Sequence, residues 1–192
     1  CAAFAQAAAV GRASLRQCSP YQARRVEAAE RDSAVDTLTG LAAYRVLHDR
    51  LISEIERSKR SLEGFAVLFI DLDYFKQVND QFGHEVGNEV LQAVANEIRH
   101  AIRASDLAAR YGGDEFVVIL TRTELEGANR VAEAIRDGIE GVGRRLGYAV
   151  GLVTASIGVA EYDVKRPHEG DLLVAADRAL YQAKSAGRNV VA

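Results

Sequence analysis

Residues 65–73 read Phe65-Ala-Val-Leu-Phe-Ile-Asp-Leu-Asp73, an apolar run that ends in two aspartates. A run this short and this apolar predicts a strand over 65–70 that is buried on both faces. Side chains alternate along a strand, so we expect Asp71 to share the face of Phe65, Val67 and Phe69. The stretch therefore predicts a central strand with a carboxylate at its end.

Outside this strand, helical and strand periodicity alternate along the chain. We expect helices over 44–60, 84–102, 125–139 and 171–186, and strands just before the turn at 112–113, over 114–120 and over 152–159, with 189–191 as a candidate edge strand. This order is typical of an α/β plan, an α+β sandwich with a mixed central sheet flanked by helices. A ferredoxin-like or palm-like core fits it, although periodicity does not choose the topology.

Composition divides the chain into two parts near residue 35. Residues 1–34 are rich in alanine and arginine and carry a charge of +2, from five arginines and three acidic residues, whereas the rest carries −5. We interpret 1–34 as a helical connector to an upstream region, with a helix from about residue 21. Residues 35–192 are expected to form one globular domain.

Charge and cysteine content favour a cytoplasmic domain that does not bind nucleic acid. The net charge is −3, and the only cysteines, Cys1 and Cys18, form neither a disulfide framework nor a zinc pattern. The absence of methionine, even at position 1, suggests a piece of a longer polypeptide. Residues 1–10 are apolar but too short to span a bilayer. Arg12 and Arg16 follow them, as at the cytoplasmic end of a membrane helix, yet a plain alanine-rich helix is the favoured interpretation.

Two acidic pairs are expected at strand ends. Asp71 and Asp73 follow the apolar run, and Asp114 and Glu115 follow Gly112-Gly113. Two glycines permit positive φ at both positions, which favours a tight hairpin and close approach of a ligand. If the two strands are neighbours, the carboxylates of Asp71 and Asp114 converge and repel unless a cation lies between them. Magnesium fits such a site, and two ions would support phosphoryl transfer; the alternative is a set of solvated turn residues.

The residues around the second acidic pair resemble a known signature. Tyr111-Gly-Gly-Asp-Glu-Phe116 is similar to the motif that names the GGDEF family of diguanylate cyclases, and the resemblance covers residues 35–191. It implies a nucleotidyl-cyclase fold and an enzyme that condenses two GTP into cyclic di-GMP and two pyrophosphates. Further family motifs stand in order at 36–41, 71–76, 79–84, 156–159 and 176–189.

The resemblance implies a catalytic group and a metal site. Two divalent ions per active site, Mg²⁺ or Mn²⁺, would be bound by Asp71, the carbonyl of Leu72 and Asp114. Glu115 would lie near the second ion or the guanine. Lys76 resembles the lysine that steadies the phosphates as charge develops. The implied catalytic residues are Asp114, Glu115 and Lys76.

The resemblance also implies the substrate-binding residues. Asn79, His84 and Asn88 fall where the family contacts guanine and ribose, and Lys184 and Arg188 resemble its phosphate-binding cations. Without the family, Asn79 is read as a turn former, His84 as a helix cap, and the two cations as partners of a helix C-terminus. The full predicted set is Phe75, Asn79, His84, Asn88, Gly112, Gly113, Lys184 and Arg188.

Two positions depart from the family pattern. Leu41-Ala-Ala-Tyr44 replaces a Leu-Pro-Asn-Arg element and leaves Arg45 one place late. Asn88 stands where the family often has aspartate, and an amide oxygen accepts the guanine N–H groups less well than a carboxylate does. The second departure makes a cyclase with relaxed base choice an alternative to a GTP-specific one.

An Arg-x-x-Asp pattern lies six residues before the signature turn. Arg103 and Asp106 match the spacing of the family's product-inhibitory site, and Arg130 is a candidate third ligand. A forked guanidinium and a carboxylate suit a phosphate and a guanine edge; a surface ion pair is the alternative. Because each domain would hold one GTP, the resemblance implies a homodimer. A catalytically idle receptor for cyclic di-GMP is the second alternative.

Overall fold

The computed structural model describes residues 34–149, 151–164 and 172–192, and Val35–Ala192 form one compact unit. The predicted connector lies outside the described residues except for Ala34, so the domain boundary stays a prediction. The elements are α3 (Tyr44–Ser61), β1 (Phe65–Asp73), α4 (Phe75–Phe82), α5 (His84–Ala101), β2 (Leu107–Gly112), β3 (Glu115–Thr121), α6 (Leu125–Glu140), α7 (Val142–Arg145), β4 (Thr154–Tyr162) and α8 (Leu172–Ser185).

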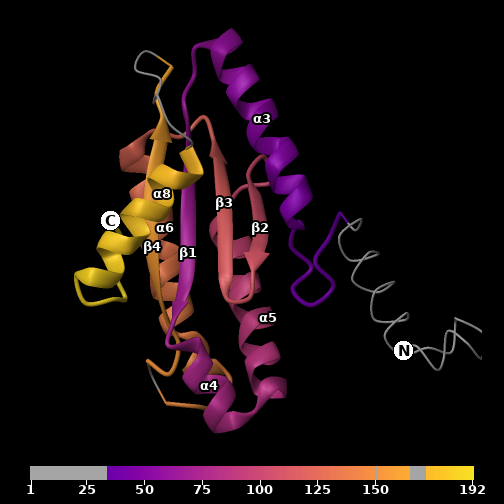
Figure 1. The fold of residues 1–192 in the computed structure, drawn as a ribbon, viewed down its shortest axis with the longest axis vertical. Helices are drawn as coiled ribbons and strands as arrows, with labels where there is room; N and C mark the ends of the chain where they lie inside the picture. The colour runs from indigo at the N-terminus through magenta and orange to yellow at the C-terminus, as the bar shows by residue number, and fades with distance from the viewer. Residues whose placement is uncertain (1–33, 150, 165–171) are drawn as a thin grey trace, which may run out of the picture. The chain divides into compact units, whose positions relative to one another are not determined.

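The four strands form one sheet in the order β2-β3-β1-β4 (Figure 1). Every neighbouring pair is antiparallel. β1 and β2 run in the same direction, because both are antiparallel to β3, which lies between them. Parallel pairing occurs in two isolated bridges at the sheet edges, Ala42 with Ala109 and Ile157 with Val191. This is a ferredoxin-like arrangement, which agrees with the predicted fold class.

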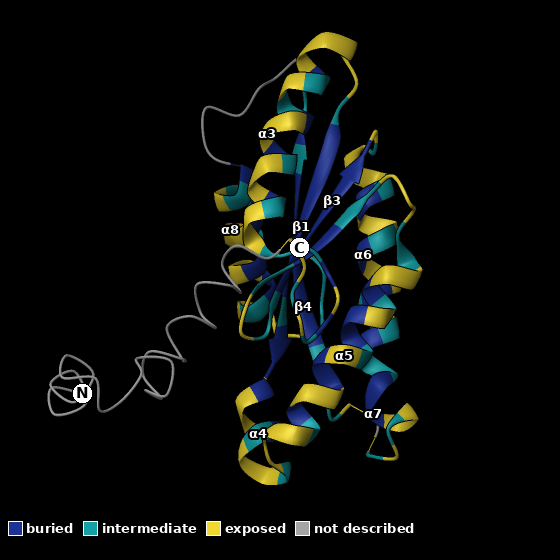
Figure 2. Cartoon of the chain, turned by 90° about the vertical axis from the view of Figure 1, so that its right-hand side faces the viewer, coloured by how far each residue is buried: buried dark blue, intermediate teal, exposed yellow. Residues whose placement is uncertain are grey.

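Helices cover both faces of the sheet, α3 and α8 on one side and α5 and α6 on the other (Figure 2). The alternation along β1 explains the two layers. Leu68 and Ile70 belong to the core cluster under α5 and α6, whereas Phe65 and Phe69 belong to the cluster under α3 and α8. All four side chains are at most 4% exposed. The apolar run at 65–70 is therefore buried on both faces, as predicted.

One close contact fixes α8 against the sheet. A Cβ at Gly158 of β4 would clash with the carbonyl of Ala176 and the amide of Leu180. Only glycine permits this approach of helix and strand backbones. The contact matters for the site because α8 ends next to the end of β1.

Three of the expected strand features differ in the structure. β1 continues to Asp73, so the acidic pair lies within the strand. The hairpin loop is Gly113 and Asp114, because Gly112 pairs with Glu115, and only Gly113 has positive φ (+51°). Residues 189–191 contribute one bridge through Val191 and no regular strand.

The helix α4 was not predicted either. It has only eight residues and starts after Tyr74, which adopts a left-handed φ of +56° without a side-chain cap. Its two buried residues, Phe75 and Val78, are too few to show a helical period. Within the described residues, no helix is long and apolar enough to cross a membrane.

Candidate active site at the end of β1 and the β2–β3 turn

The two predicted acidic groups lie side by side. Asp71 of β1 is the register partner of Glu115 of β3, and the Leu72 amide donates to the Asp114 carbonyl at 3.3 Å. The strand that carries Asp71 is therefore the neighbour of β3, which begins directly after Asp114, and this was the condition set for convergence of the carboxylates.

The acidic groups share one electrostatic environment. Burial raises the pKa of Asp71, as do the charges of Asp114 and Asp73, although Lys184 opposes the rise. The Lys184 Nζ lies 2.8 Å from Asp71 Oδ1. Burial and the charges of Asp71 and Asp114 also raise the pKa of Glu115. Negative charge has thus been concentrated where a cation would be favoured.

The donors at this point suit magnesium. They are hard oxygen atoms, and magnesium is usually held by one or two carboxylates together with substrate phosphates. Among the described residues, no group of three or more His, Cys, Asp or Glu side chains is arranged to hold a metal ion. The few carboxylates at this point suit an ion that also takes oxygen ligands from a phosphate.

A cavity of about 400 Å³ opens beside the acidic groups. This volume lies in the usual range for small-molecule sites. Asn79 comes from α4, so it is not a turn former, and His84 begins α5 behind the N-cap Gly83, so it is not the cap. Seven predicted residues line the cavity: Phe75, Lys76, Asn79, His84, Asn88, Gly113 and Asp114.

Close packing of α4 on α5 positions the polar wall of this cavity. A Cβ at Gly87 of α5 would clash with Asn79 Oδ1 and press on Phe75 Cζ at 3.3 Å. At the turn, by contrast, a Cβ on Gly112 or Gly113 would meet nothing within 4 Å. The backbone of the turn is thus open to a ligand, as expected from its glycines.

An arginine that sequence reasoning did not single out braces the turn. Arg110 of β2 donates to the Gly113 carbonyl through Nε at 3.0 Å and Nη2 at 2.8 Å. Its Nη1 lies 3.3 Å from Asp36 Oδ2, and Asp36 also accepts from the amide and hydroxyl of Thr39. The first residues of the domain are thereby linked to the loop that carries Asp114. An arginine directly before the signature was the available signal.

Residues 41–44, which depart from the family pattern, are still joined to β2 by backbone hydrogen bonds. The amide of Ala42 donates to the Ala108 carbonyl at 3.1 Å, and the amide of Arg110 donates to the Ala42 carbonyl at 3.0 Å. These bonds do not depend on side-chain identity, so the missing Pro-Asn-Arg does not break the contact with β2.

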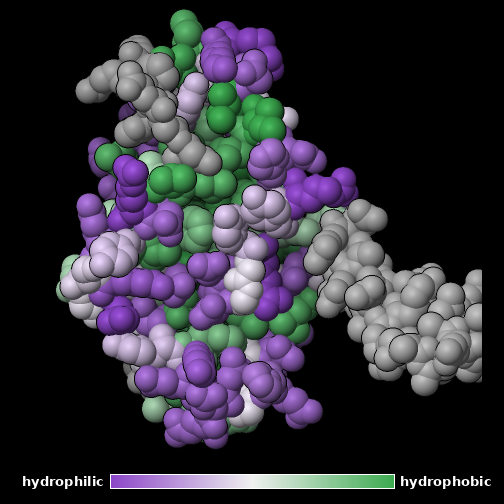
Figure 3. All heavy atoms as spheres, viewed as in Figure 1, coloured by the Kyte–Doolittle hydropathy of each residue, from purple (hydrophilic) through white to green (hydrophobic). Residues whose placement is uncertain are grey.

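Asp71, Leu72 and four further predicted residues do not line this cavity. Gly112 ends β2, and Glu115 lines a neighbouring cavity of about 590 Å³ between α3 and α8, on the face where Figure 3 shows hydrophobic atoms. Lys184 reaches Asp71 from α8. Arg188 lies over the ring of Tyr74, with its guanidinium carbon 4.7 Å from the ring centroid.

The Arg-x-x-Asp residues line a separate cavity of about 420 Å³, together with Arg99. Asp106 is largely committed to the fold, because its carboxylate accepts from the amides of Arg103 and Thr121, both at 3.0 Å. Arg103 itself is exposed. Arg130 is not among the residues that line the cavity, and it pairs with Glu126 on α6.

Comparison with known families decides the relationship. The family model described as "Diguanylate cyclase, GGDEF domain" matches residues 33–190. The chain belongs to this family. It is 40% identical over 161 residues to the response regulator PleD of Caulobacter vibrioides, and 42% identical over 154 residues to the bifunctional diguanylate cyclase/cyclic di-GMP phosphodiesterase MucR of Pseudomonas aeruginosa. These matches cover 83% and 80% of the chain but only 36% and 22% of the relatives.

Solved structures of GGDEF proteins share the fold. The diguanylate cyclase SiaD of Pseudomonas aeruginosa, in complex with its activator SiaC, is 35% identical with a TM-score of 0.75; the match covers all of this chain and 81% of that one. The GGDEF domain of DgcB from Caulobacter crescentus, in complex with c-di-GMP, is 32% identical with a TM-score of 0.75, covering 83% and 94%. The antiparallel sheet flanked by helices is therefore the GGDEF fold.

Proposed function

We propose that this domain is an active diguanylate cyclase that condenses two GTP into cyclic di-GMP and two pyrophosphates. The observation that carries the proposal is the juxtaposition at the end of β1. Asp71 is paired in register with Glu115, and Asp114 lines a cavity of nucleotide size together with Lys76. Acidic oxygens, a lysine and polar side chains suited to a purine are what nucleotidyl transfer with metal ions requires.

The substrate would be bound by groups with distinct tasks. Asn79 and Asn88 would present amides to the guanine, and Lys76 lines the same cavity, where it would neutralise charge on the phosphates. Asp71, the Leu72 carbonyl and Asp114 would hold two magnesium or manganese ions. Ions held there would supply Lewis-acid chemistry, lowering the pKa of an attacking 3′-hydroxyl and stabilising a leaving pyrophosphate.

One domain supplies half of the reaction site in this proposal. Each GTP must offer its 3′-hydroxyl to the α-phosphate of the other, so two domains have to face each other in antiparallel fashion. A symmetric homodimer satisfies this requirement. Specific activity should therefore rise with protein concentration; a flat profile with a monomer on sizing would contradict the half-site arrangement.

The second cavity is proposed as a product-inhibitory site. Arg103 is exposed and free to fork onto a phosphate, and Arg99 adds a second cation to the same cavity. Cyclic di-GMP held there would restrain turnover from outside the catalytic cavity.

Asp114→Asn tests the catalytic proposal. The amide keeps the size of the side chain but replaces an anionic ligand, so cyclisation should fall by at least about a hundredfold while the fold is retained. Asp49→Asn, the same change at an exposed position of α3, should act like the parent. Products are identified by mass after incubation with GTP and magnesium. Near-normal cyclisation by Asp114→Asn would refute the metal assignment.

A further inference from the structure

Asp73, the second aspartate of β1, has a different environment from Asp71. It is 3% exposed. Its Oδ1 accepts from the Ser156 hydroxyl at 2.7 Å, and its Oδ2 accepts from the Thr154 hydroxyl at 2.8 Å and the Asn189 amide at 3.0 Å. Three donors occupy most of the lone pairs of one carboxylate. Asp73 thus holds two segments to the end of β1 and has little capacity left for a metal ion.

The segment held at Asn189 is a turn with unusual backbone geometry. After α8 the chain passes through Gly187, Arg188 and Asn189 with φ of +123°, +66° and +49°. Left-handed φ is disfavoured for residues with a side chain, so other contacts must stabilise it. Asn189 has one on each side: its amide donates to Asp73, and its side-chain oxygen accepts from Arg136 Nη1 of α6 at 3.0 Å.

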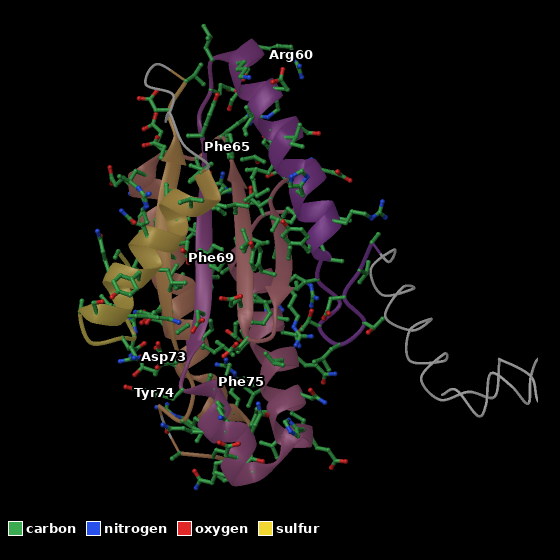
Figure 4. The ribbon with its side chains drawn as sticks, in the orientation of Figure 1. Arg60, Phe65, Phe69, Asp73, Tyr74 and Phe75 are labelled. Carbon is green, nitrogen blue, oxygen red and sulfur yellow. The ribbon has the colours of Figure 1, made fainter. Side chains whose placement is uncertain are left out.

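The side chain that this turn presents is Arg188. Its guanidinium lies over the ring of Tyr74, 4.7 Å from the centroid, and Tyr74 is the residue that follows Asp73. Figure 4 shows Asp73 and Tyr74 together where β1 passes into α4. A cation–π contact holds a guanidinium over a ring without using its N–H groups in conventional hydrogen bonds. Those N–H groups stay available for phosphate oxygens.

We propose that Asp73 and Tyr74 are positioning residues for phosphate binding by Arg188. Asp73 fixes the turn that carries the arginine, and Tyr74 supports its guanidinium through the cation–π contact. Neighbouring residues at the end of β1 and the start of α4 then have separate tasks, since Asp71 would serve the metal ions while Asp73 and Tyr74 act through Arg188. The inference rests on the proposed function, in which Arg188 binds a phosphate of GTP.

The test compares Asp73→Asn and Tyr74→Ala in the parent and in Arg188→Ala. Asp73→Asn should raise the KM for GTP roughly tenfold, because an amide cannot accept all three bonds. Tyr74→Ala should raise it about two- to fivefold, as expected for an exposed cation–π contact, and Tyr74→Phe should restore it. The magnesium concentration for half-maximal activity should stay unchanged. In Arg188→Ala neither substitution should have a further effect on KM.

The Arg188→Ala background separates positioning from a general loss of structure. Equal increases in KM with and without Arg188 would overturn the proposal, and a large shift in magnesium dependence for Asp73→Asn would make Asp73 a metal ligand instead. If Asp73→Asn does not fold, the Tyr74 variants still test whether the Arg188 guanidinium is positioned by its neighbours. Asp49→Asn controls for the chemical change. Calorimetric binding of magnesium–GTP gives the same comparison without turnover, so a parent that makes no cyclic product refutes the proposed function alone.

Discussion

The brace between Arg110, Asp36 and the signature turn yields a stability prediction that can be worked from its geometry. Arg110 donates twice to the Gly113 carbonyl, at 2.8 and 3.0 Å, and lies 3.3 Å from Asp36. The two side chains are 18% and 23% exposed. Hydrogen bonds to a charged group contribute about 1.5–3 kcal/mol, whereas exposed ion pairs contribute about 0.2–1 kcal/mol.

We expect Arg110→Ala to lower the unfolding free energy by about 2 kcal/mol, because it removes both kinds of contact. Asp36→Asn should cost about 1 kcal/mol, since the amide oxygen still accepts from Thr39 but the charge facing Arg110 is lost. The pair should show a coupling energy of about 1 kcal/mol in a double-mutant cycle. Arg110→Lys keeps the charge but loses the fork, so it should retain only part of the stability.

Equilibrium urea denaturation of the parent, Arg110→Ala, Asp36→Asn and the double variant measures this cycle, because a domain of this size is expected to unfold in one transition. Unchanged slopes would show that the substitutions alter stability and not compactness. A coupling energy below about 0.3 kcal/mol would mean that the two side chains act independently, and the brace would be refuted.

The remaining predictions concern base choice, control and acid. Asn88→Asp should raise the preference for GTP over ATP about ten- to a hundredfold, because a carboxylate accepts both guanine N–H groups; an unchanged ratio in competition assays would show that residue 88 does not read the base. Arg103→Ala should weaken cyclic di-GMP binding by about 2 kcal/mol or more, roughly thirtyfold in calorimetry, without changing initial rates; parent-like affinity would refute the inhibitory site. Burial opposes ionisation of Asp36, but bonds from Thr39 and the charge of Arg110 lower its pKa below the usual carboxyl value. A carboxyl group whose pKa is lower in the folded protein stabilises the fold at pH values above its unfolded pKa of about 4. This stabilisation is lost as the pH falls through the folded pKa. The stability gap between parent and Asp36→Asn in urea should therefore be full at pH 7 and shrink towards about pH 3; a gap independent of pH would contradict the shift.

Much of the fold and of the site was determined by local sequence. The run at 65–70 is short and apolar at every position, which is typical of a strand covered on both faces, and the helices of 14 or more residues carry enough apolar residues to show their period. The glycines of the signature likewise predicted an open turn with acidic residues beside it. These features depend on near neighbours in the chain, and for that reason composition and spacing reveal them.

The contacts that position the site were decided by the tertiary structure alone. Arg110 meets Asp36 across 74 residues, and Asn189 meets Asp73 across 116 residues. The identity of Asp73 did not distinguish a solvated carboxylate from a buried one with three donors. The register that sets Asp71 opposite Glu115 joins two strands that are not consecutive in the chain. Such contacts form only when distant segments are brought together, because their energies depend on burial and on partners that local periodicity does not specify.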